Sequence, residues 1–502
     1  MSFAAALAAI GARRDDPAAL ADLAEAALAD GEEAAALDVI VPAARICGDA
    51  RLWQWAGLLQ RALDWHKVAL SSFANAASLD PNGASIAHGR AHVALEAGED
   101  AVALFETAWR LAPANGQVLI GLAAARTAAG EGEAAAAELD RALLAAPMWI
   151  EGHAQLAQLR ATLGRADQAT ASVERAIAAA PRQAALWTLL FDLLIRQSDF
   201  AGLRDAVARA SAAGLGDALS FYAAIAAAEL GDVEGAERGF RSAPPETAPA
   251  LAIWRIRHLL RTGDLAQAIR LIDRELQGPG AARAWPYAAA AWRLTNDPRW
   301  QWLEGDARLV TVTDLTAALP PLALLADRLR SLHLARGEYL DQSVRRGTQT
   351  DGPLFSRIDP EIRAVRAAVV EAVDAHVAQL PPPDPRHPLL GQRRDRRLRF
   401  GGSWSVRLRG SGYHSNHVHP QGWISSALYV ALPDGSAGED ANGGWLALGQ
   451  PQAELGLELD PFRLVEPRPG RLVLFPSWMW HGTVPFAQGE RLTIAFDVAL
   501  PR

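Results

Sequence analysis

Three histidines near the C-terminus have the spacing of a metal site. His417 and His419 are separated by one residue, and His481 follows later in the same region. On an extended strand, residues i and i+2 point to one face, so the pair presents two imidazoles on the same side. A third imidazole from a neighbouring strand would complete a facial three-ligand site. The alternative is histidine packing in a core that also holds Trp478 and Trp480.

An arginine follows the third histidine at a position that suggests an anion partner. Arg491 lies ten residues after His481 and opens the apolar segment 491–498. A guanidinium that faces into a barrel is costly unless a carboxylate meets it. A bound 2-oxoacid could supply that carboxylate through a two-point contact. The alternative is an ion pair with Glu490 or Asp497.

Short strands must position these residues. After Phe400, apolar or alternating segments of strand length are separated by Gly, Pro and Asp, as is typical of antiparallel sheets. These segments are 404–409, 423–432, 445–448, 471–475 and 491–498. They predict an all-β domain over 396–502, a double-stranded β-helix of the jelly-roll kind.

A period of 32 to 34 residues runs through the first half of the chain. It is marked by a small or polar turn residue in segments that read like G-D-x-x-x-A. The eight markers are Gly31, Asp64, Gly98, Gly130, Gly164, Ser198, Gly231 and Gly263. Such a period indicates stacked helical hairpins, each of which buries its apolar face against its neighbours.

Two further positions repeat in the same frame. Alanine stands five residues after seven of the markers, and Leu203 takes its place in the unit of Ser198. These alanines are Ala36, Ala69, Ala103, Ala135, Ala169, Ala236 and Ala268, and the recurring prolines are Pro81, Pro113, Pro147 and Pro181. A small residue permits close helix crossing, and a proline ends the second helix. The pattern predicts a helical solenoid over 1–282.

The period is lost between residues 283 and 395. Helical patterns cover 315–335 and 362–380, and a proline-rich stretch at 381–385 precedes the charged run 393–397. We expect a helical adaptor here. With the two flanking regions, this gives an α plus all-β multidomain chain.

Composition limits the classes of partner. The net charge of −8 gives no basic surface for a phosphate backbone, so we expect no nucleic-acid partner. Cys47 is the only cysteine and Lys67 the only lysine, which excludes an internal disulfide and a Gly-Lys-Ser/Thr phosphate loop. We find no apolar run of membrane-spanning length and no readable signal peptide. We therefore expect a cytoplasmic protein with no membrane partner.

The ordered motifs resemble a known family. The stretches SGYHSNHVHPQGWISSALYVALP, GWLALGQP, PGRLVLFPSWMWHGTVPF and ERLTIAFDV are similar to bacterial 2-oxoglutarate/Fe(II)-dependent oxygenases that follow tetratricopeptide repeats. The period of the first half likewise resembles the tetratricopeptide repeat. Residues 345–350 also look family-like, which suggests that the adaptor belongs to the catalytic unit.

The resemblance implies roles for individual residues. It makes His417 and His481 metal ligands and Arg491 the group that grips the far carboxylate of 2-oxoglutarate, with Thr493 assisting. The wider superfamily places Asp or Glu where this chain has His419, so the third ligand is His419 or another residue. A three-histidine iron site is chemically reasonable.

Two further side chains belong to the candidate site. Tyr429 either donates its hydroxyl to the co-substrate or packs in the core. His414 falls on the opposite face if the strand is regular, as a substrate contact or a surface residue, and is a further candidate ligand. Asn416 and Trp423 are candidate lining residues.

The activity implied is hydroxylation of a C–H bond. The cofactors would be Fe(II) and 2-oxoglutarate as co-substrate with O2, and a protein or peptide would lie in the repeat groove. One alternative is a three-histidine metal dioxygenase that does not use 2-oxoglutarate. Another is a non-catalytic repeat protein for interactions. Arg491 discriminates, because an unpaired inward guanidinium has a clear role only when a carboxylate co-substrate binds.

Overall fold

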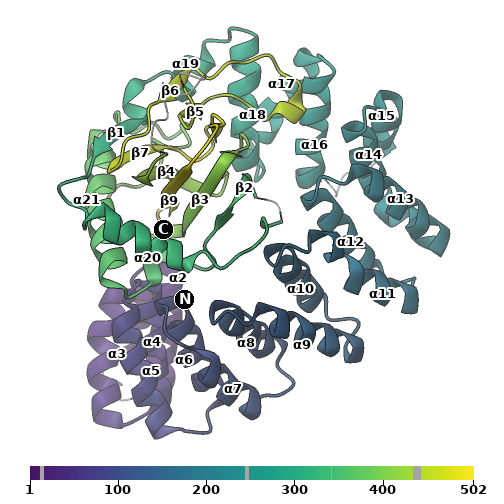
Figure 1. The fold of residues 1–502 in the computed structure, drawn as a ribbon. Coiled ribbons are helices and arrows are strands. Elements are labelled where there is room, and N and C mark those ends of the chain that lie inside the picture. The colour runs from purple at the N-terminus through teal and green to yellow at the C-terminus, as the bar shows by residue number, and fades with distance from the viewer. Residues whose placement is uncertain (12–15, 243–247, 341, 434–441) are drawn as a thin grey trace. The chain divides into compact units, whose positions relative to one another are not determined.

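The computed structural model describes residues 1–11, 16–242, 248–340, 342–433 and 442–502. Helices fill the N-terminal part of the chain and strands the C-terminal part, as predicted (Figure 1). The chain divides into two compact units. One comprises residues 1–141, 351–367 and 502, and the other comprises 142–350 and 368–501. Among the described helices, none has the length and apolar character needed to cross a bilayer.

The helices follow one another in antiparallel hairpins. The first nine are α1 (Phe3–Ile10), α2 (Pro17–Asp30), α3 (Glu33–Cys47), α4 (Ala50–Ala62), α5 (His66–Leu79), α6 (Ala84–Ala97), α7 (Val102–Leu111), α8 (Gly116–Ala128) and α9 (Gly132–Ala145). The repeats continue through α10 (Ile150–Thr162), α11 (Ala171–Ala179), α12 (Ala184–Arg196), α13 (Phe200–Ala210), α14 (Gly216–Glu229), α15 (Val233–Ser242), α16 (Ala248–Arg261) and α17 (Leu265–Glu275). Later helices are α18 (Ala281–Leu294), α19 (Arg299–Glu304), α20 (Leu322–Leu332) and α21 (Pro360–Gln379).

All eight periodic turn residues have a left-handed backbone. Their φ angles lie between 56° and 87°, and they include the two residues that are not glycine, Asp64 and Ser198. Glycine adopts this conformation without a steric cost, which explains its recurrence at the other six positions. The prolines also behave as predicted, since α5, α7, α9 and α11 each end two residues before one of them.

The periodic alanines are buried with one exception. Six of them and Leu203 are fully buried, whereas Ala103 is exposed. In that unit Ala101 and Phe105 face the core instead, and a Cβ added at Gly121 would lie only 2.1 Å from the Phe105 ring. The close helix approach therefore occurs at a glycine, and the prediction for Ala103 is wrong.

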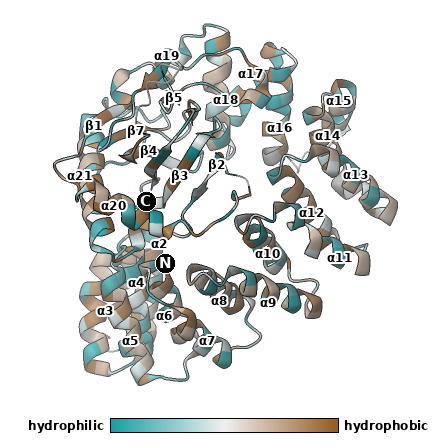
Figure 2. Ribbon diagram, in the orientation of Figure 1, coloured by the Kyte–Doolittle hydropathy of each residue, from teal (hydrophilic) through white to brown (hydrophobic). Residues whose placement is uncertain are grey.

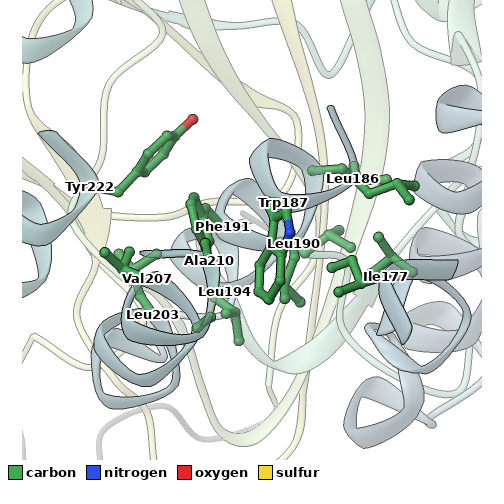
Figure 3. Packing of buried hydrophobic residues seen from close by; sticks show 14 of the residues in the cluster. Ile177, Leu186, Trp187, Leu190, Phe191, Leu194, Leu203, Val207, Ala210 and Tyr222 are labelled. Atoms are coloured by element: carbon green, nitrogen blue, oxygen red, sulfur yellow. The ribbon is translucent and has the colours of Figure 1, made fainter. Parts of the chain in front are cut away.

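Apolar side chains from successive helices form the repeat core. Figure 3 shows Trp187, Leu190 and Phe191 of α12 packed between residues of α11, such as Ile177, and residues of α13, such as Leu203. Apolar and polar residues share the repeat helices in Figure 2, as expected for helices with one buried face.

Two antiparallel sheets form the β domain. The larger has the order β1 (Thr311–Asp314), β7 (Arg471–Pro476), β4 (Gly422–Ala431), β9 (Glu490–Ala499), β3 (Phe400–His414) and β2 (Val344–Gln349). The smaller has the order β6 (Arg463–Val465), β5 (Leu446–Leu448) and β8 (His481–Thr483). Leu446 and Val465 of the small sheet share a core with Val473 and Phe475 of the large one. The sheets therefore face each other, as in the predicted jelly roll.

The segment 283–395 is not purely helical, contrary to our expectation. It contributes β1 and β2, which form the two edges of the large sheet and pair with β7 and β3. These strands have four and six residues, too few for a sequence period to distinguish them from loops. The segment is also fixed to the β domain directly, because Trp480 Nε1 donates to the carbonyl of Pro286 at 2.9 Å.

Candidate metal centre

The three predicted histidines meet at one end of the β domain. His481 opens β8, and it forms a single antiparallel bridge with His417, with N···O distances of 2.9 and 3.0 Å. His417 and His419 therefore lie in an extended segment after β3 and not on a regular strand as expected. Their i, i+2 relation still holds, and one ligand atom from each of the three histidines lies within 4.8 Å of the others.

Hydrogen bonds fix the tautomers of these imidazoles. The Nδ1 atom of His417 lies 2.8 Å from the carbonyl of Ser415, and that of His481 lies 2.9 Å from the carbonyl of Met479. A carbonyl only accepts, so both Nδ1 atoms carry the proton and both Nε2 atoms keep a lone pair. Neutral imidazoles held in this way are the usual form of histidine ligands to a metal.

Burial keeps the imidazoles neutral. Desolvation, assisted by the nearby His419, lowers the pKa of His417 to about 3. Desolvation and the neighbouring histidines likewise hold the pKa of His481 well below its usual value. Both rings are therefore ready to coordinate a cation at neutral pH without losing a proton.

His414 lies in the same pocket and not on an opposite face. It is the last residue of β3, and its ring centroid is 5.9 Å from that of His417. The chain bends after it at residues 415–416, so the alternation of a regular strand does not apply. It is outside the group of three converging ligand atoms, and its buried Nε2 has no hydrogen-bond partner among the described residues.

Arg491 is buried, and no carboxylate in the described part of the chain pairs with it. Only 2% of it is exposed, and it lines the pocket that holds the three histidines. Glu490 pairs with Arg330 at 2.8 Å and with Arg407 at 2.5 Å, while Asp497 contacts His419. Neither of the ion pairs considered for Arg491 is therefore present. Desolvation lowers the pKa of Arg491, and Tyr429 partly opposes this shift.

Tyr429 and Thr493 lie opposite each other in the pairing of β4 with β9. Thr493 lines the pocket, whereas the Tyr429 ring lies behind Arg491, whose Cζ is 5.0 Å from the ring centroid. The Arg491 Nε is buried without a hydrogen-bond partner in the described part of the chain, while the Tyr429 hydroxyl interacts with the same guanidinium. An unused donor of this kind is expected where a ligand with oxygen atoms binds.

The sequence indicates no role beside the histidines for Trp404, Ser343 or Asp497, and it suggests Asp497 only as a partner of Arg491. Trp404 stacks on His419 with ring centroids 5.7 Å apart, Ser343 Oγ lies 3.2 Å from His417 Nε2, and Asp497 accepts from His419. Asp497 shares the face of Arg491 on β9, so the period of two could have identified it. Of the two candidate lining residues, Asn416 borders the cleft described next, whereas Trp423 is buried elsewhere against the carbonyl of Leu389.

A cleft of about 1030 Å³ leads away from the histidines. One wall includes repeat residues 194–200 with Trp254 and Arg257, and the other includes residues 415–419 and described residues of the segment 338–345. The cleft shares Gln342, Ser343, His417 and His419 with the inner pocket. His417 and His419 are thus accessible from a cavity that the repeats help to form.

Comparisons with known proteins match two parts of the chain to family models. Residues 402–497 match the family model described as "Putative 2OG-Fe(II) oxygenase", and residues 93–163 match a tetratricopeptide-repeat model. No curated protein matches the chain.

Solved structures resemble parts of the chain at low identity. A MamA fragment from Desulfovibrio magneticus RS-1 is 18% identical, with 32% of this chain and 92% of that chain covered and a TM-score of 0.29. A prolyl-4-hydroxylase from Pseudomonas putida is 18% identical over 39% of this chain and 95% of that chain, with a TM-score of 0.26. The two family models therefore place a tetratricopeptide-repeat match at residues 93–163 and, C-terminal to it, a match to the family described as "Putative 2OG-Fe(II) oxygenase" at residues 402–497.

Proposed function

We propose that this protein is a 2-oxoglutarate- and Fe(II)-dependent dioxygenase that hydroxylates a C–H bond of a polypeptide. One observation carries the proposal: Arg491, a buried guanidinium with no carboxylate partner among the described residues, lies in the same pocket as the imidazoles of His417, His419 and His481. The imidazoles suit a divalent metal, and the guanidinium suits the free carboxylate of a metal-bound 2-oxoacid. A three-histidine dioxygenase without 2-oxoglutarate would leave Arg491 without a role.

Each of these residues has a proposed role in binding the metal or the co-substrate. His417, His419 and His481 would hold Fe(II) through Nε2, and Arg491 with Thr493 would hold the distal carboxylate of 2-oxoglutarate. When bound, the metal and co-substrate supply the oxidation, in which 2-oxoglutarate is decarboxylated to succinate as O2 is consumed. The protein orients the reactants and keeps water away, since His481 and Arg491 are almost fully buried.

The cleft supports a polypeptide as the substrate. Its volume of about 1030 Å³ is slightly above the range for small-molecule sites, which is about 300–1000 Å³. Its repeat wall offers the aromatic side chains Phe200 and Trp254 together with the charged Arg196 and Asp199. A mixed surface of this kind suits an extended peptide that places one side chain at the metal centre.

Anaerobic titration tests the metal and co-substrate. We expect one Fe(II) per chain, and a new visible absorption band when 2-oxoglutarate is added. His417→Ala and His481→Ala should each abolish iron binding, and wild-type protein with O2 should convert 2-oxoglutarate to succinate. Unchanged iron content in both variants would disprove the assigned centre, and a wild-type protein that binds iron but no 2-oxoglutarate would favour the other dioxygenase class.

Panning a random peptide library on the iron- and 2-oxoglutarate-loaded protein under anaerobic conditions tests the substrate. Selected peptides should become hydroxylated when O2 is admitted. Trp254→Ala should weaken their binding while succinate formation without peptide stays unchanged. Peptides that bind equally well to this variant would argue against the cleft as the substrate site.

A further inference from the structure

Among the described residues, Asp497 is the carboxylate that contacts the histidine cluster. It lies on β9, on the same face as Arg491, and its Oδ2 is 2.6 Å from His419 Nδ1. Its other oxygen, Oδ1, accepts a hydrogen bond of 2.5 Å from the Ser425 hydroxyl. Ser425 in turn lies 3.0 Å from the Ser477 hydroxyl, and the Ser477 carbonyl accepts from the backbone N–H of His419. The carboxylate is therefore held firmly behind His419.

The three imidazoles consequently differ in what lies behind them. His417 and His481 donate to neutral backbone carbonyls, whereas His419 contacts a carboxylate. A carboxylate that accepts from Nδ1–H makes Nε2 more basic and a stronger ligand. His419 is also the position at which the resemblance leads one to expect Asp or Glu. In this chain a carboxylate is still present, but it belongs to Asp497 and lies behind the imidazole of His419 instead of in the ligand position.

We propose that Asp497 is a positioning residue which, through His419, supplies the metal centre with the negative charge that three neutral imidazoles lack. This inference rests on the proposed function, because it assigns the three histidines to a metal. Asp497 is not itself in the group of converging ligand atoms, and both of its oxygens have hydrogen-bond partners. Its action on the metal must therefore pass through the imidazole of His419.

Asp497→Asn is the informative substitution. An amide can keep both contacts, with its oxygen accepting from His419 and its NH2 group donating to Ser425, so the geometry is preserved while the charge is lost. Loss of such a partner typically weakens metal binding by about 10- to 100-fold. We expect a loss of that size for Co(II) and Fe(II), together with a changed Co(II) absorption spectrum and a higher reduction potential of bound iron.

Ser425→Ala is the matched control. It removes the other hydrogen bond of Asp497 but leaves the charge, so metal affinity should stay within a few-fold of wild type. A double variant, His419→Asp with Asp497→Asn, moves the carboxylate into direct contact with the metal. If charge is what Asp497 contributes, the double variant should bind Co(II) more tightly than Asp497→Asn alone. A purely structural role for Asp497 predicts no such recovery.

A measurement on wild-type protein remains informative if a variant does not fold. With Zn(II) as a diamagnetic probe, the Nδ1 proton of His419 should resonate furthest downfield of the three ligand histidines. Wild-type affinity and spectrum in Asp497→Asn, or three equivalent Nδ1 protons, would overturn the inference. Wild-type protein that binds no metal at all would instead refute the proposed function, so the two failures are distinguishable.

Discussion

Replacing Arg491 by methionine should have two opposite effects. Without ligand, the guanidinium is a buried charge with no carboxylate partner in the described structure, so its removal should raise the free energy of unfolding of the empty protein. With 2-oxoglutarate, the same substitution leaves the distal carboxylate unpaired. Loss of one side of a buried pair costs about 3–5 kcal/mol. At about 1.4 kcal/mol per decade, this weakens 2-oxoglutarate binding by roughly two to three orders of magnitude.

Calorimetry on anaerobic iron-loaded protein measures the binding, and thermal unfolding measures the stability. The free energy of unfolding of wild-type protein should increase by about 2.7 kcal/mol at 2-oxoglutarate concentrations 100-fold above Kd. That of Arg491→Met should hardly change at the same concentration. Arg491→Lys should recover little, because an ammonium cannot reproduce the planar two-point contact. Iron affinity should stay close to wild type in both variants.

Arg407→Met provides the control for a lost arginine on the neighbouring strand. Arg407 pairs with Glu490 and is not among the pocket residues, so this variant should lose stability and keep its affinity for 2-oxoglutarate. Intact 2-oxoglutarate binding in Arg491→Met would refute the role of the guanidinium. An empty Arg491→Met protein that is less stable than wild type would show that another group already balances the charge.

Two predictions concern stability away from the pocket. Burial lowers the pKa of His376 to about 4, so between pH 6.5 and 4 the unfolded chain binds a proton that the folded chain does not. Through this group the free energy of unfolding should decrease as the pH is lowered, by at most about 1.4 kcal/mol per pH unit. Denaturant titrations of His376→Gln should therefore show a free energy of unfolding that changes less steeply with pH. Ser198→Gly should stabilise the fold by about 1 kcal/mol in the same assay, because Ser198 has φ of 56°; an unchanged or lower midpoint would contradict the strain.

The sequence predicted those turns and strands whose residues show a recognisable pattern within the segment itself. The left-handed turns at Asp64 and Ser198 follow the same frame as the glycines, and apolar or alternating segments of strand length located β3, β4, β5, β7 and β9. Edge strand β1 was missed because its four residues pair with a strand about 160 positions later. Such pairing depends on the tertiary fold, and short segments show no period that would reveal it.

The candidate site shows the same limit. The i, i+2 spacing of His417 and His419 predicted a shared face, and the tertiary fold then placed His481 beside them. The sequence left open whether Arg491 pairs with Glu490 or Asp497. That question depends on the tertiary fold, because Arg330 of α20 and Arg407 of β3 pair with Glu490, and His419 contacts Asp497.

The charges of the pocket define which co-substrate it can hold. Arg491 and Asp497 are the charged side chains among its described lining residues, and the lowered pKa values keep His414, His417 and His481 neutral. The charges of Arg491 and Asp497 cancel, so a divalent metal would give the pocket a net charge of about +2. A dicarboxylate such as 2-oxoglutarate would neutralise that charge. A 2-oxo monocarboxylate would reach the metal and leave the guanidinium buried and unpaired. The protein should therefore bind 2-oxoglutarate far more tightly than pyruvate, and Arg491→Met should reduce this selectivity.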